Sequence, residues 1–372
     1  MAENKENKQE KEALDENLAK LLKNDIIKLC SKMSVTGFEH RATEFLTNEY
    51  ANLFDSVECD GVGNYIFVKK CGKENAPKIM VDTHFDEIGF VVCEILDGGF
   101  LRFTNVGGVD RAIMQGADVI IYGKQEIRGV ISSVPPHLRE GDGKLPTIDK
   151  MLIDVGLGYS KAELEELICV GTPIGFACCY GELLNNKIAG KSFDNKACAA
   201  MAIRAVSELS RDTMAGDVYV TLSCREESAK NGGAYVCANK IKPDYALVID
   251  VNLANAPGVS SRESVEMDAG ISISICSATD RALTRRAVEL CKNKDIDYVV
   301  KTEASSTGTN AVCVNLASCG IPVVDVGLPL RNMHTYNEVI SLEDCFTLCN
   351  FIKAFVSDVD IAKDFSLEEL DI

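Results

Sequence analysis

The sequence has no apolar run long enough to cross a membrane and no apolar stretch near its start. Its longest hydrophobic runs have the length of a strand, whereas a membrane helix needs ~20 residues. Residues 1–12 are mostly Glu, Lys, Asn and Gln, without the apolar segment of a secretory signal. We therefore expect a cytoplasmic protein that does not contact a membrane.

Positive charge is scarce. The chain has 39 Lys and Arg residues against 56 Asp and Glu, which gives a formal net charge of −17. Proteins that bind nucleic acid need clusters of Lys and Arg against the phosphates, so this balance argues against a nucleic-acid partner. Carboxylates are ligands of hard cations, and the excess of acid suits metal binding, although most acidic side chains are expected to be solvated.

Paired cysteine motifs are also missing. None of the sixteen cysteines forms a Cys-x-x-Cys pair. This argues against a zinc ribbon and against a thioredoxin-type site. Without an export signal, we expect the cysteines to be reduced and mostly buried as small hydrophobic residues.

The chain has 372 residues, a length that favours more than one domain. The pattern of predicted helices, strands and turns changes along it. Residues 1–24 form a charged N-terminal extension with leucines at helical spacing. Residues 25–89 and 186–372 alternate strands with helices, typical of an α/β domain with a mostly parallel sheet flanked by helices. Residues 90–185 are short strand-like runs between Gly-rich turns, which indicates an inserted β-rich domain, either a small barrel or a sandwich. The clearest predicted elements are strands over 78–83 and 245–250 and helices over 195–210, 281–293 and 341–356.

His84 closes one predicted strand and is followed two residues later by Asp86. Side chains two residues apart on an extended chain point to the same side. The Asp86 carboxylate can then accept the imidazole N–H of His84 and leave the other nitrogen for a metal. The alternative is a histidine that merely closes a strand.

Acidic residues follow other predicted strands, at Asp194, at the pair Glu226–Glu227 and at Asp250. Functional groups gather where the strands of an α/β sheet end, so we expect these carboxylates to converge with His84 into a metal site. Adjacent carboxylates can divide the work, one binding a metal and the other acting as a general base. Taken singly, each has a structural alternative, such as a helix N-cap for Asp194 or a surface position for His334.

These residues lie in motifs that resemble those of the tetrahedral aminopeptidases. That family of dinuclear metallopeptidases includes glutamyl aminopeptidases and proteins once labelled endoglucanases. The motifs occur in the family's order, from about residue 27 to 357. They are His84-Phe85-Asp86-Glu87-Ile88-Gly89-Phe90, Gly190-Lys191-Ser192-Phe193-Asp194-Asn195, Glu226-Glu227, Asp250 with Ala256-Pro257-Gly258, and Pro329-Leu330-Arg331 with His334 and Glu338.

The resemblance implies a phosphorylase/hydrolase-like metallopeptidase domain with a β-barrel-like dimerisation domain inserted over residues 90–185. It implies homodimers that assemble into a homododecamer. The implied activity is hydrolysis of N-terminal residues from peptides with a free N-terminus.

The resemblance also implies a site with two divalent metal ions, zinc or cobalt, with manganese as a third candidate. Asp194 would bridge the ions, His84 and Asp250 would complete one, and Glu227 and His334 the other. Glu226 would be the general base for the water activated by both ions. The remaining implied roles are orientation of His84 by Asp86 and substrate binding by Asn310 and Arg331.

Two departures from the family pattern leave an alternative open. Ser228-Ala229 stands where Val-Gly is usual, and Asn310 stands where Asp is usual. They favour the alternative that the chain is a catalytically impaired metal-binding assembly protein of the same family. A glycosidase using Glu226 and Glu227 is a further rival, but it needs ~5 Å or more between the carboxyl groups and leaves the histidines unexplained. The last alternative is a metal-dependent deacylase on a related fold. An N-acylated substrate distinguishes it, because an aminopeptidase should not cleave such a substrate.

Overall fold

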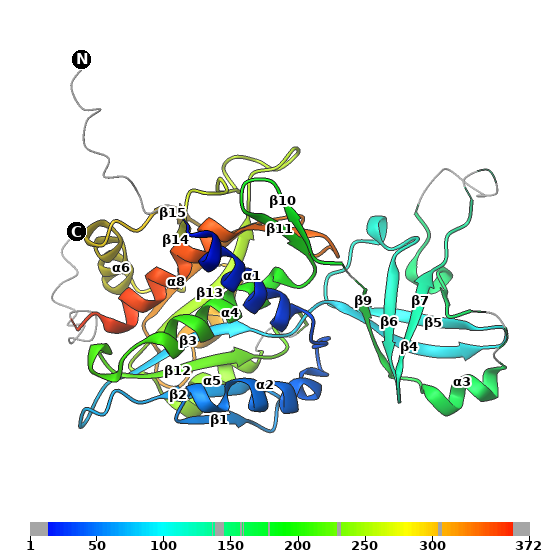
Figure 1. Cartoon of the computed structure of the whole chain (residues 1–372), viewed down its shortest axis with the longest axis horizontal. Coiled ribbons are helices and arrows are strands. Elements are labelled where there is room, and N and C mark those ends of the chain that lie inside the picture. The colour runs from blue at the N-terminus through cyan, green and yellow to red at the C-terminus, as the bar shows by residue number, and fades with distance from the viewer. Residues whose placement is uncertain are drawn as a thin grey trace, which may run out of the picture.

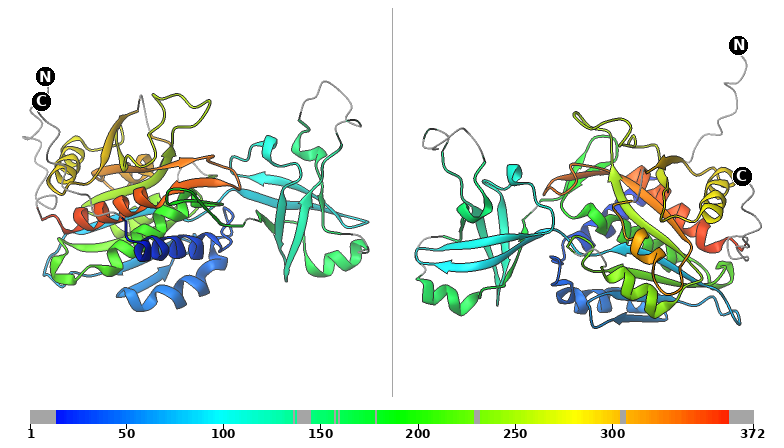
Figure 2. Two further views of the ribbon diagram at one scale, coloured as in Figure 1. Left: turned by 45° about the horizontal axis from the view of Figure 1, so that its top comes forward. Right: turned by 180° about the vertical axis from the view of Figure 1, so that it is seen from behind.

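The computed structural model describes residues 14–135, 137, 145–156, 158, 160–177, 179–228, 232–303 and 307–359. The chain forms a sheet with helices on both faces and a separate β-barrel that projects from one side (Figures 1 and 2). In the described residues, no helix combines the length and the apolar character needed to cross a membrane.

Four parallel strands form the centre of the sheet, in the order β12, β3, β13 and β16. Antiparallel strands extend this centre on both sides, β2 and then β1 beyond β12, and β17, β11 and β10 beyond β16. Strand β14 also pairs antiparallel with β16 and begins a branch. The branch ends in β15, which is parallel to β14. Their bounds are β12 (Asp217–Ser223), β3 (Lys78–His84), β13 (Tyr245–Leu253), β16 (Val323–Arg331), β1 (Ser56–Cys59), β2 (Tyr65–Lys69), β17 (Glu338–Ser341), β11 (Lys187–Gly190), β10 (Gly181–Leu183), β14 (Ile271–Ile275) and β15 (Tyr298–Thr302).

The predicted α/β class with a helix-flanked sheet is confirmed, with one refinement. The sheet is mixed, because parallel pairing dominates only its centre. The short turns between β1 and β2 and between β10 and β11 allow only antiparallel pairing, since a parallel connection needs a crossover of a dozen or more residues.

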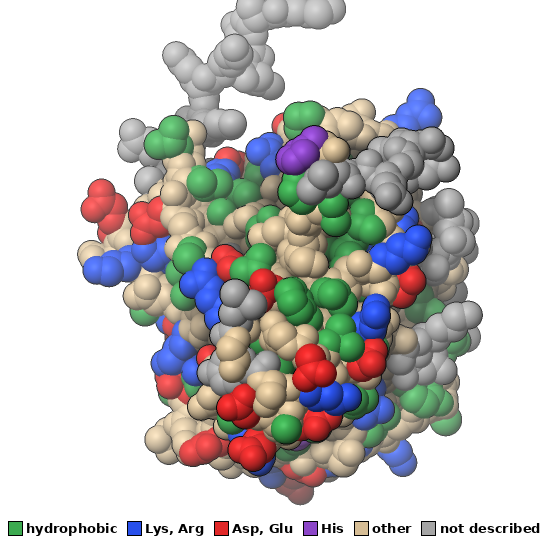
Figure 3. Space-filling view, turned by 90° about the vertical axis from the view of Figure 1, so that its right-hand side faces the viewer, with side chains coloured by type: hydrophobic (Ala, Val, Ile, Leu, Met, Phe, Trp, Pro, Cys, Tyr) green, Lys and Arg blue, Asp and Glu red, His purple; other side chains and the backbone are tan. Residues whose placement is uncertain are grey.

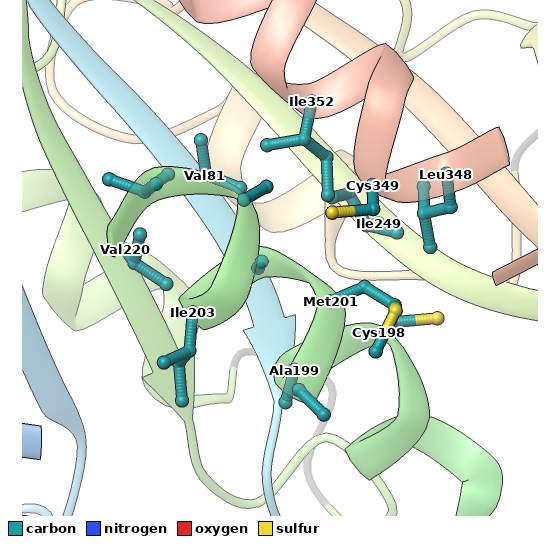
Figure 4. Close-up of a cluster of buried hydrophobic side chains, with 14 of the residues drawn as sticks. Val81, Cys198, Ala199, Met201, Ile203, Val220, Ile249, Leu348, Cys349 and Ile352 are labelled. Carbon is teal, nitrogen blue, oxygen red and sulfur yellow. The ribbon is translucent and has the colours of Figure 1, made fainter. Parts of the chain in front are cut away.

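Helices cover both faces of the sheet. Figure 4 shows one of the resulting contacts, in which Met201 of α4 packs near Ile249 of β13 and Cys349 of α8. A smaller apolar cluster lies on the other face, under α5 and α7. The first face carries α1 (Glu16–Cys30), α2 (Thr43–Tyr50), α4 (Phe193–Glu208), α6 (Arg281–Asn293) and α8 (Leu342–Ser357), and the second carries α5 (Gly233–Ile241) and α7 (Ala311–Asn315).

Helix α1 corrects the predicted end of the N-terminal extension. It runs from Glu16 to Cys30 without a break at residue 24. Leu22, Ile26 and Leu29 are fully buried, so a single apolar stripe docks the helix on both sides of that position. The charged composition of residues 1–24 therefore did not mark a structural boundary. Residues 1–13 lie outside the described residues.

The inserted segment is a closed barrel, which decides between the two architectures that the sequence left open. Its strands close in the order β4, β5, β8, β7, β6 and β9. Its core is apolar and includes Phe90, which packs edge-on against Phe103 and Phe176. The bounds are β4 (Gly89–Leu96), β5 (Phe100–Val106), β8 (Ile153–Asp154), β7 (Glu126–Ile131), β6 (Asp118–Tyr122) and β9 (Pro173–Phe176), with α3 (Lys161–Leu167) at its side.

Most predicted elements lie where the sequence placed them. The helix over 281–293 is α6, and α4 and α8 agree with the prediction within two residues at each end. Strand β10 pairs with β11 in the main sheet, so residues 181–183 belong to that sheet and the barrel ends before the predicted boundary at 185.

Nine of the fifteen cysteines in the described residues are buried, and all fifteen are free thiols.

Candidate metal centre

The predicted metal ligands converge on one edge of the sheet. His84 ends β3, and Asp250 lies on the adjacent parallel strand β13, whereas Asp194 follows β11 at the start of α4. They lie at one end of a cavity of about 420 Å³. Its wall is formed by His84, Asp194, Glu226, Glu227, Asp250, Val251, Asn252, Leu253, Ser272, Ser274, Lys301, Glu303, Thr307, Gly308, Thr309, Asp325, Val326, Gly327, Met333 and His334.

The ligand atoms form two groups that share Asp194. In the first, His84 Nε2 lies 3.0 Å from Asp194 Oδ1 and 3.5 Å from Asp250 Oδ1. In the second, His334 Nε2 lies 3.5 Å from Asp194 Oδ2 and 3.4 Å from Glu227 Oε2. The two oxygens of Asp194 thus face different histidines, and the atoms within each group lie within 4.8 Å of one another.

Asp194 reaches this position through an irregular start of α4. Ser192 is the N-cap and adopts a left-handed conformation with φ of 60°, so the sequence alternative of Asp194 as an ordinary N-cap is wrong. Asp194 itself is non-helical, with φ of −75° and ψ of 105°. The Asp194–Asn195 peptide bond is cis, and the Asn195 amide donates to the Ile249 carbonyl at 2.8 Å. The Asp194 carboxylate lines the cavity, where it lies near both His84 and His334.

Asp86 contacts more than its predicted partner. Its backbone carbonyl, and not its carboxylate, is the near partner of His84 Nδ1, at 3.1 Å. The carboxylate lies 3.7 Å from that nitrogen and accepts the backbone N–H groups of Glu226 and Glu227 at 3.0 and 3.1 Å. It also accepts the Thr36 hydroxyl. Asp86 therefore holds the backbone of the glutamate pair as well as the histidine.

Glu338 has a positioning role that the sequence motif did not reveal. One oxygen accepts the backbone N–H of Asp194 and the other accepts the backbone N–H of His334, both at 3.1 Å. Glu338 begins β17 and pairs with Gly190 of β11, two positions before Ser192. The sequence offered one signal for this role, a carboxylate at Glu338 four residues after the candidate ligand His334. That spacing does not show that the Glu338 side chain holds two segments together.

The acidic surroundings change the protonation of the site. Burial raises the pKa of Glu226 to about 8, with Asp250 and Asp194 adding to the effect and His84 opposing it. Burial and the Asp194 charge raise the pKa of Glu227 to about 8. A hydrogen bond to Asp194 raises the pKa of His334 to about 9. Burial lowers the pKa of His84, but the nearby carboxylates outweigh this and hold it well above its usual value.

These residues fit divalent metal ions. Imidazole nitrogens and carboxylate oxygens are the ligand types of zinc and similar ions. The crowded carboxylates draw protons onto the histidines and onto one another, and cations between them would relieve the same repulsion. Each histidine also has a backbone or carboxylate contact that fixes its position.

The two predicted substrate-binding residues lie elsewhere. Asn310 is buried beneath the cavity, where its amide donates to Asp82 and Ser223, both at 3.0 Å. Arg331 donates to the backbone and side-chain oxygens of Asn255, at 2.6 and 3.0 Å, and holds the segment after β13. Neither residue belongs to the cavity wall.

A family comparison agrees with this geometry. The family model for M42 glutamyl aminopeptidases matches residues 63–351. The chain belongs to the M42 glutamyl aminopeptidase family. It is therefore a peptidase, a hydrolase of peptide bonds, and membership implies divalent metal ions.

Relatives of this M42 peptidase match most of its length. The lysyl aminopeptidase of Pyrococcus furiosus is 28% identical over 89% of this chain and 96% of its own. Aminopeptidase APDkam598 from the archaeon Desulfurococcus kamchatkensis has 29% identity and a TM-score of 0.84, covering 91% of this chain and 95% of its own. The TET1 peptidase of Pyrococcus horikoshii has 25% identity and a TM-score of 0.79, covering 90% and 99%; it can assemble into a tetrahedron or a large octahedral shell.

Proposed function

We propose that this M42 peptidase is a two-metal aminopeptidase that removes the first residue from peptides with a free N-terminus. The observation that carries the proposal is the pair of three-residue ligand groups that share Asp194. One group is His84, Asp194 and Asp250, and the other is Asp194, Glu227 and His334. The names of its relatives support the same activity.

Divalent ions, when bound, would supply positive charge that polarises the scissile carbonyl and lowers the pKa of the attacking water. The five ligands would hold them. Zinc or cobalt suits the histidine and carboxylate donors, and manganese is a third candidate.

Glu226 is the general base of the proposal. Its side chain lines the cavity, and its Oε2 lies 4.0 Å from His84 Nε2. Among the described residues its carboxylate has no hydrogen-bonding partner, whereas its backbone N–H is fixed by Asp86. The carboxylate is thus free to accept the proton of the attacking water and to return it to the leaving amine nitrogen.

One of the two departures that favoured a catalytically impaired protein, Asn310, has a structural explanation. Asn310 occupies a structural position beside Asp82 instead of a place in the cavity wall. Ala229 lies outside the described residues. A peptidase with an intact set of ligands is the simpler interpretation.

The test is hydrolysis of aminoacyl-p-nitroanilides by metal-reconstituted protein, each substrate paired with its N-acetylated form. We expect cleavage of free-amine substrates only, and loss of cleavage with chelator. Glu226→Gln should keep its metal content but lose ~10²–10⁴-fold in turnover. Two bound metals per chain without any hydrolysis would instead favour the assembly protein, and cleavage of the acetylated forms would favour a deacylase.

The assembly proposal concerns the barrel. Residues 90–185 would form a homodimer, and dimers would build a dodecamer, as the tetrahedral form of the P. horikoshii relative suggests. Figure 3 looks onto the barrel side of the molecule, where apolar side chains gather between charged ones. Large apolar residues exposed in the described part of residues 90–185 are Val130, Val134, Leu145, Val170, Leu183 and Leu184. Native mass spectrometry would distinguish a dodecamer from a dimer or a monomer.

A further inference from the structure

The cavity continues from the metal ligands across three neighbouring strands. Asp250 of β13 is in register with Gly327 of β16, and Gly327 with Ser272 of β14. In the next row, Asp325 of β16 is in register with Ser274 of β14. Side chains two residues apart on a strand share a face, so Asp325 lies on the same face as Gly327, ~7 Å further along β16. Asp325 therefore lies within a side chain's reach of the metal ligands.

Gly327 shapes the floor between the two ends of the cavity. A Cβ at this position would lie 2.5 Å from Ser272 Oγ and 2.6 Å from Asn252 Nδ2. The glycine lets these two side chains meet above it, where the Asn252 amide donates to the Ser272 hydroxyl. The floor that leads from Asp250 to Asp325 is thus polar and closely packed.

Asp325 is a buried carboxylate that lines the cavity without a positively charged partner. It is 2% exposed, and Thr309 donates its hydroxyl to Oδ1 at 3.0 Å. Ser274 and Thr307 supply further hydroxyl contacts. No Lys, Arg or His of the described residues forms an ion pair with it. Burial of an unpaired charge is unfavourable, and an ionised carboxylate has about four acceptor positions, so hydroxyls leave room for a cationic donor from the cavity.

The nearest lysine on this wall is already paired. Lys301 of β15 is in register with Ser274, and its Nζ lies 2.8 Å from Glu303 Oε1. The Glu303 carboxylate offsets the charge of this lysine, which makes the wall less favourable for an acidic substrate side chain. At this end of the cavity Asp325 has no cationic partner among the described residues, and burial together with the Asp250 charge raises its pKa to about 7. Val251, Leu253 and Met333 add apolar wall that suits the methylene stem of a long basic side chain.

We propose that Asp325 determines specificity and that the enzyme prefers peptides whose first residue is Lys or Arg. The proposal rests on the aminopeptidase function proposed above. The Asp325 carboxylate would accept hydrogen bonds from the ammonium or guanidinium group while the substrate's first peptide bond lies at the metal ligands. Charge-assisted hydrogen bonds of this kind are about twice as strong as neutral ones.

The test compares kcat/KM for lysyl-, norleucyl- and glutamyl-p-nitroanilide. Norleucine keeps the methylene chain of lysine and lacks the ammonium. We expect wild type to favour lysyl over norleucyl substrate by about tenfold to a hundredfold. Asp325→Asn, which keeps the side-chain size, should lower this ratio to about one. Asp344→Asn is the matched control, because Asp344 is a buried aspartate outside the cavity that binds backbone N–H groups.

The outcomes separate the two proposals. Equal or better cleavage of the norleucyl or glutamyl substrate by wild type overturns the role of Asp325 while the aminopeptidase function stands. An unchanged lysyl-to-norleucyl ratio in Asp325→Asn overturns it as well. If the metal-loaded protein cleaves none of the three substrates, both proposals fail. The lysyl-to-norleucyl ratio of kcat/KM is measured on the wild-type protein. It therefore tests the role of Asp325 even if Asp325→Asn does not fold.

Discussion

The barrel and the main sheet bury very different side chains. Among the described residues of 89–177, Thr172 is the only buried polar residue, and the barrel core is a continuous apolar cluster. The main domain buries charged residues at one sheet edge, among them His84, Asp86, Glu87, Asp194 and Asp250. Both regions are built from strands, so secondary structure alone does not explain the contrast.

This difference shows where the molecule places unfavourable interactions. A buried charge is destabilising unless it is paired and hydrogen-bonded, and the barrel avoids that cost almost entirely. The main domain accepts it near the cavity, where backbone N–H groups, histidines and lysines hold the carboxylates, and at a few other positions such as Asp344, which binds backbone N–H groups. Predictions at four positions, from the largest expected effect to the smallest, test this separation between a binding region and a stabilising one.

Asp194→Asn should have the largest effect. Asp194 belongs to both ligand groups, so its loss should remove both metals, whereas Asp250→Asn should remove one. Because metal ions supply several kcal/mol of catalysis, we expect activity to fall by ~10³-fold or more. Metal analysis of the purified variants gives the stoichiometry, and equal retention of metal by both variants would contradict the shared role.

Glu87→Gln should destabilise the main domain. Glu87 accepts Lys191 Nζ at 2.5 Å, lies 3.4 Å from Lys196 Nζ, and accepts the backbone N–H of Ser34. Removing one partner of a buried ion pair costs about 3–5 kcal/mol, because the remaining charge stays buried. Urea denaturation at pH 7 measures this loss.

The same variant should show a defined pH dependence. Burial raises the pKa of Glu87, but the two lysine charges lower it further, to about 2 from 4.5. Because the folded pKa is depressed, the stabilisation is complete above about pH 4.5 and is lost as pH falls toward about 2. The stability difference between wild type and Glu87→Gln should therefore shrink between these values. A difference that stays constant on acidification would show that the charge is unimportant.

Phe90→Ala tests the barrel core. Phe90 is fully buried and packs against Phe103 and Phe176, with ring centroids 5.2 and 5.1 Å away. A buried phenylalanine replaced by alanine costs about 3–5 kcal/mol. We expect lower thermal stability and weaker assembly, with kcat/KM per folded chain nearly unchanged. A large drop in kcat/KM would show that the barrel core is coupled to the site.

Gly107→Ala should sharpen the comparison at one of the places where the two regions meet. Gly107 follows β5 with φ of +77°, and a Cβ there would lie 2.8 Å from Ile88 Cγ2 and 3.5 Å from Glu227 Cβ. Gly116→Ala is the matched control, with φ of +82° and open space around the Cβ. Both should lose about 1 kcal/mol from backbone strain. Only Gly107→Ala should also lose about tenfold in kcat/KM, because it displaces the loop beside Glu227.

The sequence predicted the ligands because strand ends can be recognised from local patterns. His84 and Asp250 end apolar runs whose parallel pairing brings them to one edge. It also predicted the inserted β-rich segment, from its short strands and Gly-rich turns. It was less accurate about boundaries, because α1 continues past the predicted end of the N-terminal extension at residue 24, to Cys30.

The sequence by itself determined the α/β class, the inserted β-rich segment and the identity of the candidate ligands, since these depend on local periodicity and on motifs. Only the tertiary structure decided how distant segments meet. Asn310 turns inward because Asp82 and Ser223 lie beneath it, and Glu338 joins Asp194 to His334 because β17 pairs with β11. Asp325 lines the cavity because β16 pairs with both β13 and β14. Such contacts depend on the register between strands far apart in the chain, and no local pattern encodes that register.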